Sequence, residues 1–152
     1  MTRIGFLWIL LTLVSAPALQ APDQRPFDGN WDIVLSCSNR PGVMGFSYRF
    51  SSVVKDSVLH AEHGPKGQPG WLQIEGKIQR DGTASFYADG LVGASDAAVG
   101  HLPSGTEYGY HIEAKFADDE GTGHRVEGRA CDLTFRRIRQ DRNGREAKDK
   151  SQ

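Results

Sequence analysis

Residues 71–89 read WLQIEGKIQRDGTASFYAD, and this stretch decides the fold class. Apolar and polar residues alternate along Trp71–Gln79, which is the period of a β-strand with one buried face. Asp81-Gly82 is the strongest hairpin signal in the chain, and we expect a two-residue turn with positive φ at both positions. Thr83–Asp89 alternates again on the return. The stretch therefore predicts two antiparallel strands joined by a tight turn.

Similar alternation recurs on both sides of this hairpin. We expect further strands at Asn30–Ser38, Gly45–Val54, Val58–His63 and Thr106–Phe116, and one long bent strand or two short ones within His124–Ile138. No segment spaces its apolar residues as an amphipathic helix would over three turns. Seven or eight strands without crossover helices predict an all-β antiparallel meander. We expect it to close into a small barrel, which removes exposed sheet edges, with a β-sandwich as the alternative.

The segments between the strands are rich in glycine and turn-forming residues. Gly64–Gly70 and Gly90–Gly105 are the two longest loops, and Ala117–Gly123 is interpreted as a turn. Because loops carry most binding residues, the two long loops are the first candidates for contact with a ligand or partner. Beyond the turn, the apolar members of the expected strand or strands in His124–Ile138 are Val126, Leu133 and Phe135.

Cys37 and Cys131 are the two cysteines of the chain. They fit no metal-ligand spacing, and an even pair in an exported protein is most simply a disulfide. Cys37 continues the apolar face of its strand, and Cys131 precedes Leu133 at the same spacing. We therefore predict a Cys37–Cys131 disulfide that ties the first strand to the last, since barrel closure makes these strands neighbours.

The N-terminus has the layout of a cleavable signal peptide. Arg3 precedes an apolar run of eleven residues, Ile4–Val14, and Ala16-Pro17-Ala18 supplies a small–x–small cleavage pattern. The apolar run is too short to span a bilayer as a helix. We predict cleavage after Ala18 and a periplasmic or secreted protein without a transmembrane segment.

The expected organisation is a signal peptide over 1–18, a lead-in over 19–26, one β-barrel domain over 27–138 and a disordered basic tail over 139–152. Removal of residues 1–18 leaves a net charge of −2, and seven Lys and Arg gather from Arg136 onward. The body of the chain is therefore acidic, which argues against nucleic acid as a partner.

Gly29-Asn30-Trp31, at the head of the first strand, resembles the Gly-x-Trp motif of the lipocalin and avidin group. In that group the tryptophan closes one end of the barrel beneath an arginine of the last strand. The resemblance implies that Trp31 and either Arg136 or Arg137 close this barrel. The second lipocalin motif, a Thr-Asp-Tyr triplet, is absent, so ligand habits are not carried over.

A broader resemblance covers Phe27–Arg137 and points to an uncharacterised secreted family of alphaproteobacteria, rhizobia especially. It implies the compartment and a β-barrel fold, and it brings no established activity. The motifs that carry it are Phe27-Asp28-Gly29-x-Trp31, Gly67-x-Pro69-Gly70, Gly76-x-Ile78-x-x-Asp81-Gly82, Gly105-Thr106-x-Tyr108-x-Tyr110, and Gly121-x-Gly123-x-Arg125 through Arg129-x-Cys131.

Motifs for catalysis, cofactor binding or metal binding are absent from the sequence, which has no P-loop, His-Glu-x-x-His or Gly-x-Ser-x-Gly. We therefore expect no catalytic residue, no cofactor and no metal. A zinc site shared by His60, His111 and His124 across strands is the alternative to surface histidines. Asp118-Asp119-Glu120 lacks the Asp-x-Asp spacing of a calcium loop and is interpreted as a solvated hairpin tip.

Aromatic residues are the candidates for a ligand cup, because tyrosine combines an apolar ring with one polar group. Packing inside the barrel is the alternative role for them. The candidates are Tyr48, Trp71, Tyr87, Tyr108 and Tyr110.

The expected function is that of an exported, non-enzymatic binding module. Its ligand is a small molecule in the barrel mouth or a protein partner on the rim. A lysozyme-inhibitor-like interaction module is the alternative, since Ser104-Gly105-Thr106-x-x-Gly109 is similar to the Ser-Gly-rich loop of those barrels. An enzyme without a recognisable motif is the third hypothesis.

Overall fold

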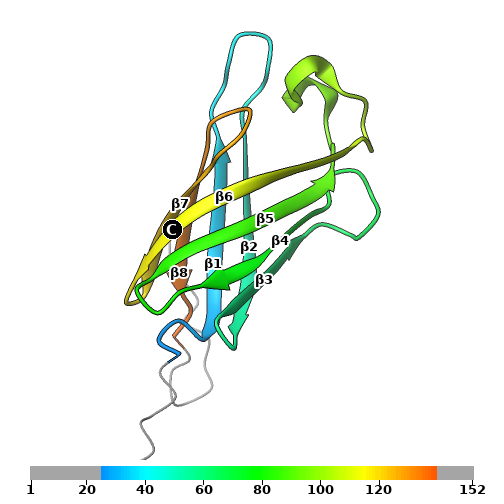
Figure 1. The fold of residues 1–152 in the computed structure, drawn as a ribbon. Coiled ribbons are helices and arrows are strands. Elements are labelled where there is room, and N and C mark those ends of the chain that lie inside the picture. The colour runs from blue at the N-terminus through cyan, green and yellow to red at the C-terminus, as the bar shows by residue number, and fades with distance from the viewer. Residues whose placement is uncertain (1–24, 140–152) are drawn as a thin grey trace, which may run out of the picture.

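The structure, a computed structural model, describes residues 25–139, which form a closed barrel of eight antiparallel strands (Figure 1). Two short 3₁₀ turns, η1 (Ser95–Ala97) and η2 (Val99–His101), lie between the fifth and sixth strands. The strands are β1 (Gly29–Cys37), β2 (Phe46–Lys55), β3 (Val58–His63), β4 (Leu72–Ile78), β5 (Thr83–Leu91), β6 (Glu107–Ala117), β7 (Glu120–Arg125) and β8 (Cys131–Arg137). The predicted closed meander is confirmed, and the sandwich alternative is wrong.

The barrel closes through the pairing of β1 with β8. The register places Trp31 opposite Arg137 at one end and Cys37 opposite Cys131 at the other. The two cysteine Cα atoms lie 4.2 Å apart and the side chains form the predicted disulfide. The closure therefore has a covalent link at one end of the paired strands.

The inward face of each strand follows the period of two. Along β1, Trp31, Ile33, Leu35 and Cys37 are all buried, while their neighbours are partly or fully exposed. An aromatic cluster fills the end of the barrel near Trp31. Its members are Phe27, Trp31, Phe86 and Phe135, whose ring centroids lie 4.8–6.1 Å from that of Phe116. We call this end the base.

Arg137 covers Trp31 at the base. Its guanidinium carbon lies 4.6 Å from the centroid of the Trp31 ring, which is a cation–π contact. The same guanidinium donates to the carbonyl oxygens of Pro26 and Asp28 and pairs with the Asp119 carboxylate at 2.9 Å. Arg136 points to the exposed outer face instead. Of the two arginines expected to close the barrel, the structure therefore places only Arg137 on the tryptophan.

The turn at Asp81-Gly82 differs from the predicted two-residue turn. Gly82 alone has positive φ (83°), and its amide donates to the carbonyl oxygen of Gln79, while the amide of Gln79 donates to Thr83. This is a three-residue loop, a type I turn followed by a left-handed glycine. Asp81 instead accepts hydrogen bonds from the amide and hydroxyl of Thr83, which fixes the start of β5.

The two-residue turn with positive φ at both positions lies between β2 and β3, at Asp56 (55°) and Ser57 (64°). Neither residue is glycine, so the left-handed backbone costs energy. The Asp28 carboxylate accepts hydrogen bonds of 2.9 Å from both turn amides, one on each oxygen. The aspartate of the Phe-Asp-Gly-x-Trp motif thus stabilises a turn distant in sequence.

The seventh strand begins earlier than the sequence analysis expected. Within Ala117–Gly123 only Asp118 and Asp119 form the turn, because β6 extends to Ala117 and β7 starts at Glu120, which pairs with it. A Cβ atom at Gly121 would lie 2.9 Å from the Phe116 ring, so these glycines mark close packing against β6. Val126, one of the apolar members of the expected strand, is 50% exposed, and Arg125 takes the inward position opposite Ile112.

The predicted signal peptide over 1–18, residues 19–24 of the lead-in and residues 140–152 of the tail lie outside the described residues. Within 25–139, Pro26 contributes a carbonyl to Arg137, and Arg139 pairs with Asp119. No helix in this range is long and apolar enough to cross a membrane.

The disulfide should contribute strongly to stability, because it closes a long loop with a sequence separation of 94. We expect the Cys37→Ser/Cys131→Ser variant to lose about 4 kcal/mol of unfolding free energy, according to the chain-entropy relation. Chemical denaturation of oxidised wild type and the double variant measures this loss. Thiol titration of unfolded, unreduced wild type should detect no free thiol, and two thiols per chain would contradict the disulfide.

Replacement of adjacent arginines tests the closure at the base. Arg137→Gln should lower the unfolding free energy by roughly 2–4 kcal/mol, because the carbonyls of Pro26 and Asp28 lose a charged donor and the buried Trp31 ring loses its cover. Arg136→Gln removes the same charge from the outer face and should change stability by less than about 0.5 kcal/mol. Equal losses in the two variants would show that charge, and not the contact with Trp31, is responsible.

Candidate functional site

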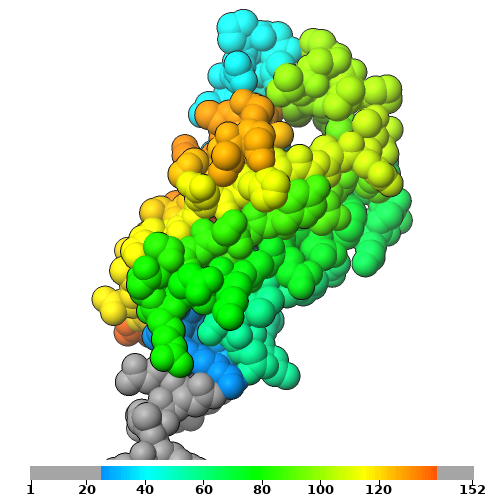
Figure 2. All heavy atoms as spheres, viewed as in Figure 1, coloured from blue at the N-terminus to red at the C-terminus, as the bar shows by residue number. Residues whose placement is uncertain are grey.

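The end of the barrel opposite the base, which we call the mouth, encloses a cavity of about 380 Å³. The β1–β2 loop, the β7–β8 loop and the η1–η2 segment all lie at this end (Figure 1). The space-filling view shows an opening bounded by the β7–β8 loop, the η1–η2 segment and β6 (Figure 2). The cavity is therefore formed between strands below and three loops above.

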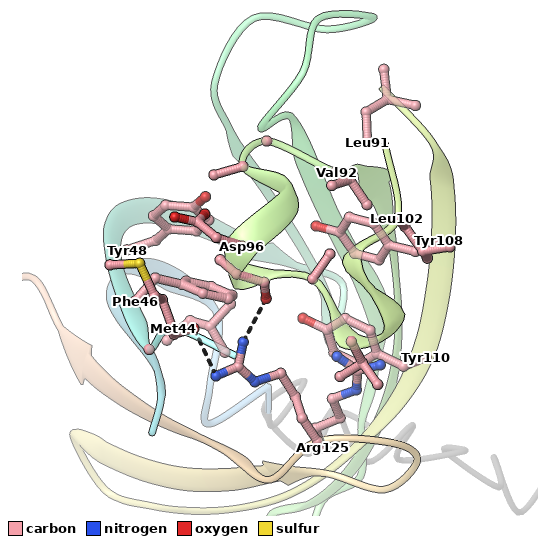
Figure 3. Close-up of a pocket in the computed structure, with 18 residues that line it drawn as sticks. Met44, Phe46, Tyr48, Leu91, Val92, Asp96, Leu102, Tyr108, Tyr110 and Arg125 are labelled. Atoms are coloured by element: carbon pink, nitrogen blue, oxygen red, sulfur yellow. Dashed lines mark hydrogen bonds between the residues drawn. The ribbon is translucent and has the colours of Figure 1, made fainter. Parts of the chain in front are cut away.

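Aromatic side chains form two opposite walls of the cavity (Figure 3). Phe46 and Tyr48 come from β2, with ring centroids 4.9 Å apart. Tyr108 and Tyr110 come from β6, with nearly parallel rings 6.1 Å apart. In each pair the residues are two positions apart on one strand, so both point inward. Each wall stands on a strand that is hydrogen-bonded to neighbours on both sides, so the sheet fixes the position of the two walls.

Room for the tyrosine rings is made on the neighbouring strand. A Cβ atom at Gly90 on β5 would lie 2.7 Å from the Tyr108 hydroxyl and 2.4 Å from the Trp71 carbonyl oxygen. Any side chain at this position would displace Tyr108 from the wall. The glycine is therefore part of the construction of the cavity.

Burial keeps the hydroxyls of two wall tyrosines, Tyr108 and Tyr110, protonated at neutral pH. Burial raises the pKa of Tyr110 from 10.0 to about 12, although the nearby Arg125 charge opposes this effect. Burial also raises the pKa of Tyr108, and the neighbouring Tyr110 and Tyr48 add to the rise. The hydroxyls of Tyr48, Tyr108 and Tyr110 make no hydrogen bond within residues 25–139. Each hydroxyl therefore has an O–H group that can donate to a ligand.

Arg129 lies under the mouth and is 3% exposed. Its terminal nitrogens donate to the carbonyl oxygens of Ser38 (2.6 Å), Met44 (3.2 Å) and Ala97 (2.7 Å). Its Nε is buried without a partner in the described structure. The guanidinium therefore joins the end of β1, the β1–β2 loop and η1, yet no carboxylate neutralises its charge. Burial lowers the pKa of Arg129, and the charges of Arg125 and Arg40 lower it further.

Arg125 stacks on the ring of Tyr110, with its guanidinium carbon 4.0 Å from the ring centroid. Its Nε donates to the carbonyl oxygen of Glu127 at 2.5 Å. The Glu127 carboxylate faces away, because it accepts from the amide (2.7 Å) and the ring Nδ1 (2.6 Å) of His111. Those two bonds lower the pKa of Glu127. Arg125 thus lacks the counter-ion that lies nearest to it in sequence.

The structure separates the aromatic residues predicted to bind a ligand. Tyr48, Tyr108 and Tyr110 line the cavity, and Trp71 and Tyr87 do not. Tyr87 is on the outer face beside His111, and Trp71 precedes β4 with Lys66 over its ring. The physical reason is strand parity, since both residues alternate with the inward members of their strands. Of the two long loops, Gly90–Gly105 contributes to the lining, and Gly64–Gly70 does not.

Sequence reasoning missed the two arginines of the site. Arg125 and Arg129 appear there only as part of a resemblance, because the apolar residues of this segment, Val126 among them, and not the charged ones, define its strand pattern. The available signal is the Gly-x-Gly-x-Arg spacing of 121–125, which puts two glycines and an arginine on one strand face.

The histidines proposed as a zinc site lie apart on the outer surface. His60, His111 and His124 each stand beside a different glutamate, Glu75, Glu127 and Glu113. No group of three metal-ligating side chains gathers anywhere in residues 25–139. The acidic turn is not simply solvated either, because the Asp119 carboxylate pairs with Arg137 and Arg139, which lowers its pKa.

Comparison of the chain with protein families, with curated proteins and with solved structures finds no match. The geometry of the mouth is therefore the basis on which a function is proposed.

The buried phenols should be visible in an alkaline titration. A group whose pKa is raised by folding stabilises the fold below its unfolded pKa of 10.0, and this stability is lost as the pH rises toward about 12. The Tyr110→Phe variant should lack one ionisation step near pH 12 and lose less stability between pH 10 and 12 than wild type does. Phenolate absorbance and melting temperature measure both effects.

Protein in denaturant is the control, because all four tyrosines should ionise there near their ordinary value. An unchanged high-pH step in Tyr110→Phe would contradict the assignment.

Proposed function

We propose that this chain is an exported, non-enzymatic module that holds a small, largely apolar molecule in the mouth of its barrel. The observation that supports the proposal best is the cavity of about 380 Å³ between two aromatic walls. Binding sites for small molecules commonly fall in this range of volume and combine apolar walls with a few polar groups.

The rigidity of the walls supports binding further. The Tyr48 ring stacks on His63 at 4.1 Å, and the Tyr110 ring is covered by Arg125. Rings held in place before a ligand arrives lose little conformational entropy on binding. Leu91, Val92 and the alanines in and beside η1 (Ala94, Ala97 and Ala98) add apolar surface to the lining.

The chemistry of the lining supports binding and suggests no reaction. In the described lining, the polar side-chain groups are three tyrosine hydroxyls, two arginines and the Asp96 carboxylate. Acid–base catalysis uses a pair of groups whose environments drive their pKa values apart, and we identify none among these residues.

Export rests on the sequence of residues 1–18, and the disulfide is consistent with an oxidising compartment. The contact between Trp31 and Arg137 supports the lipocalin and avidin resemblance as a further proposal. An architecture of that kind, with a closed base and an open mouth, agrees with ligand binding at the mouth.

A protein partner on the rim is the second candidate. Three large apolar side chains around the opening, Met44, Val99 and Leu102, are 41–57% exposed. Exposed apolar clusters at a concave site are typical of binding surfaces. The lysozyme-inhibitor-like function belongs to this class.

Filling the cavity from above separates the two candidates. Ala98, half-buried, lines the cavity beside η1, so an indole at this position should occupy the space between the aromatic walls. Ala98→Trp should lower the affinity for the uncharged probe phenylnaphthylamine by about tenfold or more, as equilibrium dialysis measures. Loss of the probe's apolar contacts gives this magnitude.

Val53→Trp is the matched control, because Val53 is exposed on the outer wall of β2 and far from the lining. It should bind the probe as wild type does. If Ala98→Trp binds the probe as tightly as wild type does, the cavity is not the ligand site and the rim becomes the leading candidate.

A further inference from the structure

The mouth contains two arginines, Arg125 and Arg129, that form no ion pair within residues 25–139. Their hydrogen bonding differs. Arg129 uses its terminal nitrogens on three backbone carbonyl oxygens, so it contributes charge more than free donors. Arg125 makes a single hydrogen bond through Nε, and its terminal nitrogens have no acceptor within residues 25–139. Arg125 therefore brings both charge and unused N–H groups to the cavity lining.

The carboxylates near the mouth do not neutralise these arginines. Asp96 lines the cavity but forms no ion pair with either guanidinium in the described structure. Glu127, two residues beyond Arg125, is held by the amide and ring of His111. Two guanidinium groups and one carboxylate leave an excess positive charge in a mouth that is otherwise aromatic and apolar.

This local charge opposes the charge of the whole molecule, which is −1 for the full chain. Two arginines near one another also repel, and a partly buried cation without a counter-ion is costly. An anion placed between Arg125 and the tyrosine hydroxyls would relieve both costs. It would receive charge-assisted hydrogen bonds from one side and phenol hydrogen bonds from the other.

We infer that the ligand of the mouth is an organic monoanion with an apolar body, whose carboxylate or sulfonate head is bound by Arg125 and whose body lies between the walls formed by Phe46, Tyr48, Tyr108 and Tyr110. This inference rests on the proposed function, since it names the chemical class of the same ligand. Figure 3 shows the arrangement: the hydroxyl oxygens of Tyr108 and Tyr110 point across the cavity, and Arg125 lies at the foot of Tyr110.

Two probes that differ by one sulfonate group test the inference. Anilinonaphthalene sulfonate and phenylnaphthylamine share the same ring system, and only the first carries an anionic group. We expect oxidised wild-type protein to bind the sulfonate more tightly. Arg125→Gln should raise the Kd of the sulfonate about tenfold or more, which is the usual contribution of a charge-assisted hydrogen bond, and should leave the Kd of phenylnaphthylamine nearly unchanged.

Three further variants make the result specific. Arg125→Lys keeps the charge and should retain part of the preference, and Tyr110→Phe should weaken the sulfonate alone because it removes one donor. Arg49→Gln removes an equal charge from the outer wall, where Arg49 pairs with Asp32, and should change neither Kd. Binding of the uncharged probe in each variant also reports an intact cavity.

The outcomes separate the inference from the function beneath it. If wild type binds both probes equally, or if Arg125→Gln and Arg49→Gln have equal effects, the anion is not recognised and the inference is overturned, although the cavity still binds ligands. If wild type binds neither probe, the proposed function fails, and the inference fails with it.

Discussion

The pairing of β1 with β8 is the contact on which both ends of the molecule depend. One register places Arg137 opposite Trp31 and, six residues along β1, Cys131 opposite Cys37. Since the interval is even, all four side chains lie on the inward face or at its margin. If β8 slipped by one residue against β1, Arg137 and Cys131 would both turn outward. The contact at the base and the disulfide at the mouth therefore depend on the same register.

The disulfide and Arg129 form one connected unit at the mouth. Arg129 precedes Cys131 by two residues, and Ser38, which follows Cys37, supplies a carbonyl to the Arg129 guanidinium. The Arg129 guanidinium also donates to the carbonyl oxygens of Met44 and Ala97, and the Met44 amide donates to the carbonyl oxygen of Asp96. Loops that would otherwise move independently are thus joined above the cavity. Oxidation of the cysteines therefore contributes to the shape of the mouth as well as to stability.

The fold could be predicted because its information is local. Alternation along single strands predicts every strand except β7, of which only His124 and Arg125 fall within an expected strand, and the parity of Cys37 and Leu133 is sufficient to predict the disulfide. The same parity excludes Trp71 and Tyr87 from the interior, because each is adjacent in sequence to an inward residue. The alternation therefore already argues against a place for these two residues in a ligand cup.

Other features of the site depend on contacts between distant segments. Arg125 faces inward because β7 pairs with β6 in a register that places Gly121 against the Phe116 ring. Its lack of a counter-ion depends on Glu127 reaching His111 on a neighbouring strand. Neither fact can be obtained from the residues around Arg125 alone. Hydrophobicity gave the opposite answer there, since it favours Val126 as the buried residue.

The contrast between the two ends of the interior indicates why the mouth is hollow. Large aromatic rings fill the base, whereas small residues, Gly93, Ala94, Ala97 and Ala98, stand over the mouth. Protein interiors are normally packed as densely as organic crystals, and an unfilled volume of this size lowers stability. Larger side chains on η1 would fill it without altering a strand. The cavity and the guanidinium of Arg125, which forms no ion pair within residues 25–139, therefore both lower the stability of the fold. Destabilising features of this kind are expected at sites where a protein binds a ligand.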